Sequence, residues 1–124
     1  MLAAFVLLAA LAQSPGRADL DARFCESARD NQAQLRPRLP ITDNGERLDS
    51  FTPDCGQRLL VWERALVADP GLSVDQWRAR REAGWSHIVC EIPRFRDAVS
   101  RGWRFTESIV HVDGSRHEFT ARCG

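Results

Sequence analysis

Hydrophobic and polar positions along this chain predict three helices and two β-hairpins. In residues 19–35 the apolar side chains recur near helical spacing, and Pro37 and Pro40 prevent the helix from continuing. Asp19 or Asp21 can cap the start of this helix. We therefore expect a first helix over residues 19–35.

Two apolar stretches, residues 46–52 and 57–67, predict the first hairpin. Asp43-Asn44-Gly45 forms a turn before the first stretch, and Pro53-Asp54-Cys55-Gly56 forms a turn between the two. Alternate positions of the second stretch are apolar on both faces: Leu60, Trp62 and Leu66 on one, and Leu59, Val61 and Ala65 on the other. This pattern is typical of a central strand that is covered on much of both sides.

The second half of the chain predicts two helices. Ser73 followed by Gln76 matches the capping box of a helix start. The expected buried stripe of this helix consists of Trp77, Trp85, Ile88 and Val89, and the side chains expected to face water are Arg78, Arg80, Arg81 and Glu82. Pro93 ends the helix or opens a shorter one that Gly102 closes.

A final hairpin is expected around Asp113-Gly114, one of the strongest two-residue turns. Trp103, Phe105 and Ile109 alternate on its first strand, and His117, Phe119, Ala121 and Cys123 alternate on its second. A two-residue turn pairs His111 with Arg116 and Val110 with His117. This register would place the two histidines on opposite faces of the sheet.

The element order α-ββ-αα-ββ predicts the α+β class. We expect an antiparallel sheet of about four strands, made of the two hairpins, with the helices packed on one face. The chain without its first residues has the usual length of one domain, so residues 19–124 are expected to form a single unit.

Residues 1–18 have the pattern of a secretory signal peptide. An uncharged apolar run extends from Leu2 to Ala12, and cleavage is expected after Ala12 or Ala18. The alternative is a retained N-terminal helix. No later apolar run is long enough for a membrane span, and Ala22-Arg23-Phe24 before Cys25 does not match a lipid-modified N-terminal cysteine. We therefore expect an exported protein, periplasmic or secreted.

The charge balance of 17 basic and 17 acidic residues argues against nucleic-acid binding and a polybasic membrane anchor. Four cysteines allow three pairings, among which the sequence alone does not choose. We favour Cys25–Cys55 and Cys90–Cys123, because each bond would join a helix to the hairpin after it. A zinc site is the alternative, but no close metal-ligand spacing occurs, so neither a metal nor a cofactor is expected.

Candidate catalytic residues are few. The histidines are His87, His111 and His117, and Ser108 and Ser115 lie near two of them outside any nucleophile-elbow motif. The nearby carboxylates Glu107, Asp113 and Glu118 are expected to pair with Arg104, Arg116 and Arg122 on a solvated sheet face. We therefore expect no catalytic residue.

The four tryptophans are the strongest lead to a binding surface. Trp62 and Trp77 fit apolar faces of their elements, which leaves Trp85 and Trp103 as the expected partly exposed pair. Arg81 and Arg104 lie beside them in the sequence. These four residues form the expected interaction patch, although core filling beside a solvated basic face explains them as well.

Several segments resemble a family of small uncharacterised bacterial secreted or periplasmic proteins. These segments are Leu39-Pro40-Ile41-Thr42-Asp43-Asn44-Gly45-Glu46-Arg47-Leu48-Asp49-Ser50, then Cys90, Gly102, Asp113-Gly114 and Cys123. The resemblance implies a signal peptide, one α+β domain and a bond between Cys90 and Cys123. The chain departs from the family outline at Glu46, Trp62 and Phe105, and the resemblance implies no activity.

The function expected from the sequence is an exported, non-enzymatic domain that binds another envelope or secreted protein, as a monomer. A specific version is an inhibitor or immunity protein against a secreted hydrolase. The competing class is a small hydrolase using His111 or His117, which needs a pocket and a carboxylate or serine near the ring. An assembly subunit with an unpaired edge strand is the third possibility.

Overall fold

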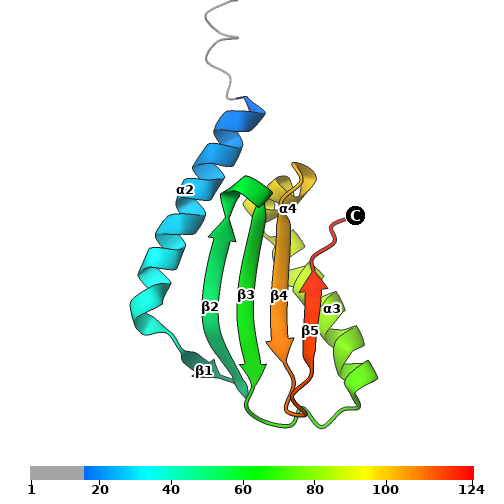
Figure 1. Cartoon of the computed structure of the whole chain (residues 1–124). Coiled ribbons are helices and arrows are strands. Elements are labelled where there is room, and N and C mark those ends of the chain that lie inside the picture. Colours follow the sequence, from blue (N-terminus) through cyan, green and yellow to red (C-terminus); the bar gives the residue numbers. More distant parts are fainter. Residues whose placement is uncertain (1–15) are drawn as a thin grey trace, which may run out of the picture.

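A computed structural model describes residues 16–124, where one mixed sheet carries three helices (Figure 1). The helices and strands in chain order are α2 (Arg17–Leu35), η1 (Arg36–Arg38), β1 (Ile41–Asp43), β2 (Glu46–Asp54), η2 (Cys55–Gln57), β3 (Leu59–Leu66), α3 (Val74–Glu91), α4 (Pro93–Ser100), β4 (Arg104–Val110) and β5 (Arg116–Thr120). The α+β class and the positions of the three helices agree with the sequence.

The predicted signal peptide lies mostly outside this description, because residues 1–15 are not part of it. The expected cleavage after Ala12 therefore falls on residues that are not described, and cleavage after Ala18 would fall within α2. None of the helices in residues 16–124 combines the length and the apolar character needed to cross a membrane.

The sheet differs from the expected one in strand number and in direction. It has five strands in the order β1-β2-β3-β4-β5, and β3 and β4 run parallel whereas the other neighbours are antiparallel. The parallel pair arises because α3 and α4 form a crossover that returns the chain to the starting end of β3. The expected antiparallel sheet of four strands is therefore wrong, although β3 is central as predicted.

The additional strand, β1, pairs with β2 across the Asn44-Gly45 turn. Asn44 has a φ of 51° and Gly45 a φ of 77°. Positive φ at both central residues is typical of a two-residue hairpin turn that matches the strand twist. The sequence predicts the turn but not the strand, because β1 has only three residues between Pro40 and the turn, and two of them are polar.

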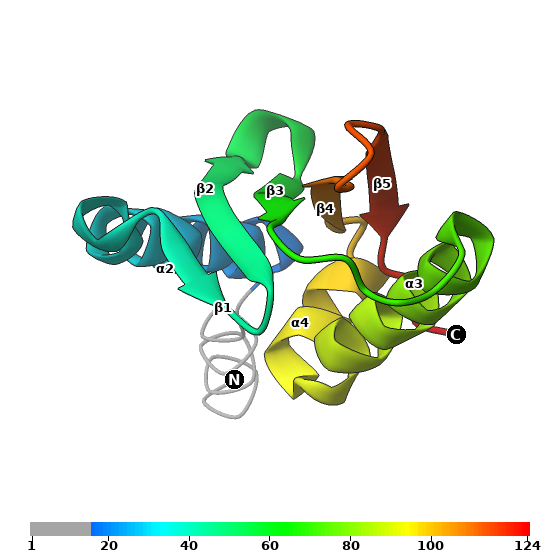
Figure 2. The ribbon, with the colours of Figure 1, turned by 90° about the horizontal axis from the view of Figure 1, so that it is seen from below.

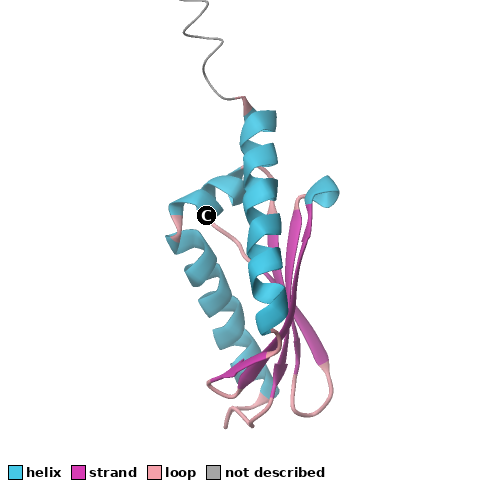
Figure 3. Cartoon of the chain, turned by 90° about the vertical axis from the view of Figure 1, so that its left-hand side faces the viewer, coloured by secondary structure: helices cyan, strands magenta, loops and turns pink. Residues whose placement is uncertain are grey.

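All three helices cover the same face of the sheet, as expected (Figure 3). The covered face carries the buried side chains of the core, which include Phe51, Leu60, Phe105, Ile109 and Phe119. The opposite face is open, and Leu59, Val61 and Ala65 remain partly exposed on it. The prediction that this strand is covered on much of both sides is wrong, because none of the helices in residues 16–124 packs on the second face.

Phe105 of β4 lies at the centre of the core, where all three helices meet the sheet. Its ring lies 5.9 Å from Phe24 of α2 and 5.1 Å from Phe95 of α4, between ring centroids. The indole Nε1 of Trp85 in α3 donates to the Phe105 carbonyl oxygen at 2.9 Å. All three helices therefore contact β4 at the same residue.

Two disulfides connect helices to the following hairpins. Cys25 in α2 is bonded to Cys55, and Cys90 in α3 is bonded to Cys123. These are the two pairs favoured from the sequence. The bonds join α2 to η2 and α3 to the C-terminal segment after β5.

Candidate binding groove

A groove runs over β2 and β3 between α2 on one side and the α3–α4 pair on the other. Figure 2 shows the two helical walls on the same side of the sheet and apart from each other. The groove contains two hollows, of about 370 Å³ and about 460 Å³. Trp62 lines the first and Trp85 the second, and their ring centroids are 5.0 Å apart.

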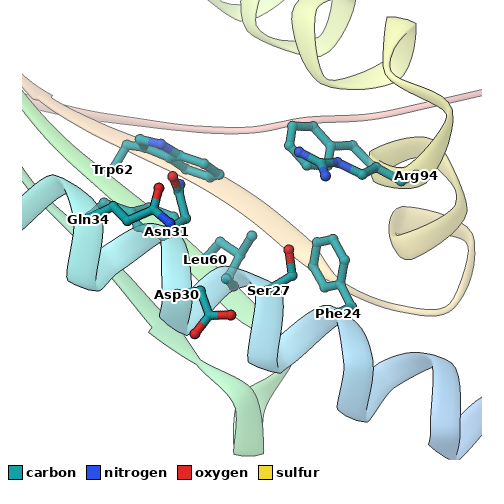
Figure 4. Close-up of a pocket in the computed structure, with 11 residues that line it drawn as sticks. Phe24, Ser27, Asp30, Asn31, Gln34, Leu60, Trp62 and Arg94 are labelled. Carbon is teal, nitrogen blue, oxygen red and sulfur yellow. The ribbon is translucent and has the colours of Figure 1, made fainter.

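The first hollow, called here the α2–α4 pocket, has an aromatic floor and polar walls (Figure 4). Its lining includes Phe24, Ser27, Asp30, Asn31 and Gln34 of α2, Phe51, Leu60 and Trp62 of the sheet, and Arg94 and Phe95 of α4. The polar residues of α2 recur three and four positions apart, so they share one face of the helix. Asn31 and Gln34 extend towards Trp62, and Arg94 stands on the other side of the opening (Figure 4).

The second hollow, called here the α3 pocket, contains a buried carboxylate. Glu107 is 1 % exposed, and it receives hydrogen bonds from Arg81 (Nη2–Oε2 3.0 Å) and Arg64 (Nε–Oε2 3.2 Å). The expectation that Glu107 lies on a solvated sheet face is wrong. Position 107 is on the covered face of β4, opposite Trp62 of β3, so its charge must be neutralised internally.

Arg81 is the residue that connects this charge cluster. Its guanidinium binds Glu107 and also reaches the Glu46 carboxylate, with an Nη1–Oε1 distance of 2.5 Å. Burial alone would lower the pKa of Arg81, but the hydrogen bonds and charges of Glu107 and Glu46 raise it overall. Arg81 is thus a fixed cation in the pocket wall, and its expected position facing water is wrong.

The rim of the α3 pocket exposes Gly84 and Ile88 on neighbouring turns of α3. Ile88 is 59 % exposed, so its predicted place in the buried stripe is wrong, whereas Trp77, Trp85 and Val89 of that stripe are buried. A Cβ atom added at Gly84 would meet no atom within 4 Å. Packing within the described chain therefore does not require glycine at position 84.

The four residues of the expected interaction patch do not come together. Trp85 and Trp103 are only 7 % and 2 % exposed, and their expected partial exposure is wrong. Trp85 and Arg81 line the α3 pocket, whereas Trp103 donates from Nε1 to Asp21 of α2 at 2.9 Å. Arg104 is exposed on β4, one position from buried Phe105 and so on the opposite, open face of the sheet.

Trp62 is the tryptophan that sequence reasoning missed as a site residue. It contacts the rings of Phe51 and Phe105, yet it remains partly exposed because it lies between the two helical walls. Nothing in the strand pattern distinguishes it from its neighbours Leu60 and Leu66. Its exposure depends on where α2 and α3 cross the sheet.

The hairpin histidines share one face, which contradicts the predicted register. Ile109 pairs with His117, and the His111 amide donates to the Ser115 carbonyl oxygen at 2.8 Å. The connection therefore has three loop residues, 112–114, with Gly114 at a φ of 88°. One additional loop residue moves every side chain of β5 to the other face.

Both histidine rings pack against Trp77 of α3. The ring centroids of His111 and His117 lie 5.0 Å and 5.2 Å from it, and both histidines are buried. His117 also has Ser115 Oγ 2.7 Å from its Nε2 atom, which resembles a nucleophile–base pair. Whether His117 can accept a proton from Ser115 depends on the partner of its other ring nitrogen, Nδ1.

Nδ1 of His117 lies 2.9 Å from Nη1 of Arg78. Arginine only donates, so Nδ1 accepts and the ring proton resides on Nε2. Nε2 then donates to Ser115, whose hydroxyl donates to Asp113 Oδ1 at 2.5 Å. In this arrangement His117 has no free lone pair to accept the Ser115 proton, and the geometry is that of a structural hydrogen-bond chain.

No protein-family model matches the sequence, and no curated protein is detectably similar to it. Two solved structures share the fold. A protein of Pseudomonas aeruginosa described as secreted has a TM-score of 0.58 at 12 % identity, covering 81 % of this chain and 91 % of that one.

The second structure is the pilotin of the Vibrio vulnificus type 2 secretion system, with a TM-score of 0.55 at 14 % identity, covering 84 % of this chain and 94 % of the pilotin. At such identities the likeness concerns the fold. Two disulfides in the chain fit a place outside the cytoplasm. The chain thus shares its α+β fold with a protein described as secreted and with a secretion-system pilotin.

Proposed function

We propose that this chain is an exported, non-enzymatic binding domain of the bacterial envelope, which takes a segment of another envelope protein into its α3 pocket. The observation that carries the proposal is the open, glycine-containing rim of that pocket. Gly84, Ile88 and Arg80 lie along one side of α3 and border a hollow of about 460 Å³. A rim of this kind fits a partner that approaches the helix closely.

Glycine at position 84 destabilises α3, and no contact within the described chain requires it there. Glycine inside a helix is less favourable than alanine by about 1 kcal/mol. Because an added Cβ would meet no neighbour, alanine at position 84 would fit without strain. A partner backbone that approaches α3 at this position supplies the physical reason for glycine, since a side chain there would hold it away.

Ile88 and Arg80 supply the contacts that such a segment needs. Ile88 exposes 59 % of its surface one turn from Gly84, and apolar exposure at a pocket rim favours association. In the described residues Arg80 makes no ion pair, unlike Arg81, so it can receive a carboxylate from the partner. An apolar segment with an acidic residue matches this rim.

The fold and the disulfides support the class of partner that we propose. A fold shared with a secretion-system pilotin makes a protein of an envelope secretion assembly the first candidate. Such a partner meets the domain in the oxidising compartment where its disulfides form. The groove is concave, which suits a segment that inserts rather than a flat protein surface.

Gly84→Leu tests the proposal against the matched control Ala79→Leu. Both substitutions add the same side chain to an exposed position of α3, but only position 84 lines the pocket. The oxidised wild-type domain is immobilised on a resin and incubated with an envelope fraction. It should retain a partner protein, which the Ala79→Leu variant also retains and the Gly84→Leu variant does not. Circular dichroism and the thermal midpoint establish that both variants are folded.

Equal retention by both variants would contradict the proposed surface, and an envelope fraction from which the wild type retains no protein would contradict the proposed function. Gly84→Ala adds a second readout. It should raise the free energy of unfolding by up to about 1 kcal/mol while weakening partner binding. A stabilised variant that binds worse separates a binding role from a structural one.

A further inference from the structure

We propose that the α2–α4 pocket binds a saccharide of one or two rings, at a site separate from the α3 pocket. Its volume of about 370 Å³ lies within the usual range for small-ligand sites. Such sites combine an apolar floor with a few polar groups that fix orientation. The α2–α4 pocket has both features in one opening.

The polar side chains of this pocket are exposed and have no polar partner among the described residues, although the Arg94 guanidinium lies 5.1 Å from the centroid of the Phe95 ring. Within residues 16–124, no side-chain hydrogen bond or ion pair engages Ser27, Asp30, Asn31, Gln34 or Arg94. The α3 pocket differs, because its Arg81, Glu107 and Glu46 are paired with one another. The unused donors and acceptors of the first pocket are therefore available to a ligand.

Carboxamides suit the hydroxyl groups of a sugar. Each offers one acceptor oxygen and two donor hydrogens from a planar group, so Asn31 and Gln34 can bind neighbouring hydroxyls that both donate and accept. The single charges of Asp30 and Arg94 offset each other, which favours a neutral ligand. An acyl chain would leave all these groups unpaired and so fits the pocket poorly.

The floor suits the other surface of a sugar ring. Saccharide rings carry C–H groups on their faces, and these pack against aromatic side chains through dispersion and weak C–H contacts. Trp62 is partly exposed in the pocket, and its indole Nε1 has no hydrogen-bond partner in the described chain. The indole packs against Phe51 and Phe105 inside the core, and its exposed part lies beside the carboxamides of Asn31 and Gln34 (Figure 4), so apolar and polar groups meet at the opening.

The test is a titration of the isotope-labelled, oxidised domain, followed by amide and indole NMR resonances. N,N′-diacetylchitobiose and cellobiose serve as probes, because the first carries acetamido groups that carboxamides bind and the second does not. We expect shifts at Trp62 and along the α2 wall, with a Kd of about 1 mM or tighter and stronger binding of the acetamido sugar.

Asn31→Ala and Gln34→Ala should each weaken binding about fivefold, since each removes a neutral hydrogen bond. Gln32→Ala is the matched control on α2, because Gln32 does not line the pocket and should leave affinity unchanged. Gly84→Leu should retain the sugar, and the Asn31→Ala, Gln34→Ala double variant should retain the protein partner. These crossed outcomes separate this proposal from the proposed function.

Absence of shifts with both sugars at about ten times the expected Kd would overturn the proposal. Equal affinity of wild type and the double variant would overturn it as well. Shifts at the same residues caused only by a protein partner would assign the pocket to that partner instead.

Discussion

The sequence pattern predicts that Glu107 is exposed to solvent, whereas the fold buries it. In the sequence it lies among arginines and reads as part of a solvated charge ladder. In the structure it is 1 % exposed and is bound by Arg64 and Arg81. A buried carboxylate with two arginine partners is stabilising only while the set is complete.

Glu107→Gln should therefore destabilise the fold strongly. It leaves Arg81 and Arg64 without their shared anion, and breaking a buried ion pair costs about 3 kcal/mol or more. Urea unfolding of the oxidised protein measures the loss. Glu118→Gln, at an exposed position of β5, is the control, and it should lower the free energy of unfolding by less than about 0.5 kcal/mol. Equal losses in the two variants would mean that burial of Glu107 has no energetic consequence.

The candidate site could be predicted only in part at the residue scale. Arg81 and Trp85 were selected from the sequence and do line the α3 pocket. Trp62 fits an apolar face of its strand and so reads as core. Gly84 is unfavourable inside a helix, but helix propensity alone does not connect it with a pocket. Their exposure is decided by helices from distant parts of the sequence.

The elements themselves formed largely where local chemistry placed them. Ser73 caps α3 with the predicted reciprocal bonds to Gln76, at 3.2 Å in both directions. The start of α2 differs, because Gly16 is its N-cap and makes no side-chain bond. Asp21 does not cap the helix. It instead accepts hydrogen bonds from Arg101 and Trp103 and ties α2 to the end of α4.

This attachment should make stability depend on pH. The Arg101 hydrogen bond, followed by that of Trp103 and by the charges of Arg58 and Arg101, lowers the pKa of Asp21 despite opposing burial. Because the pKa of Asp21 is lower in the folded state, its ionised carboxylate stabilises the fold at pH values above the unfolded-state pKa of about 4. This stabilisation is lost as the pH falls through the folded-state pKa.

Asp21→Asn should thus lower the thermal midpoint at pH 7, and the difference from wild type should shrink as the pH falls below about 4. Thermal unfolding between pH 7 and pH 3 measures it. Asp30→Asn is the control in the same helix, because Asp30 makes no ion pair among the described residues. A difference that stays constant over this range would contradict the ionic role of Asp21.

On the scale of the whole molecule, the disulfides fasten the outer helices to the sheet. Each bond closes a loop of about thirty residues, with sequence separations of 30 and 33. Constraining such a loop in the unfolded chain is worth about 3 to 4 kcal/mol. This is comparable with the net stability of a small domain, about 5 to 15 kcal/mol.

Replacing Cys90 and Cys123 together by serine should lower the thermal midpoint by more than about 10 °C. Differential scanning calorimetry under oxidising conditions measures the change. Adding a reductant should lower the midpoint of the wild type by at least as much, since it opens both bonds. An unchanged midpoint in the double variant would show that the Cys90–Cys123 bond contributes nothing to stability.

The sequence by itself determined the features that depend on neighbouring residues. Helix limits at Pro37 and Ser73, the α+β class and the helix-to-hairpin spacing of the cysteines all follow from local propensity and short-range patterns. These choices are made within a few residues of chain. The three-residue loop before Ser115 marks the limit, because a single residue there changes the face of a whole strand.

Only the tertiary structure decided the parallel pairing of β3 with β4, the open second face of the sheet and the position of the groove. Each depends on how the α3–α4 crossover returns across the sheet and on where α2 packs. That arrangement places Trp62 in the α2–α4 pocket, where it stays partly exposed, and buries Glu107 beneath α3. Burial is a property of the assembled layers, so strand periodicity can indicate which residues share a face but not what covers it.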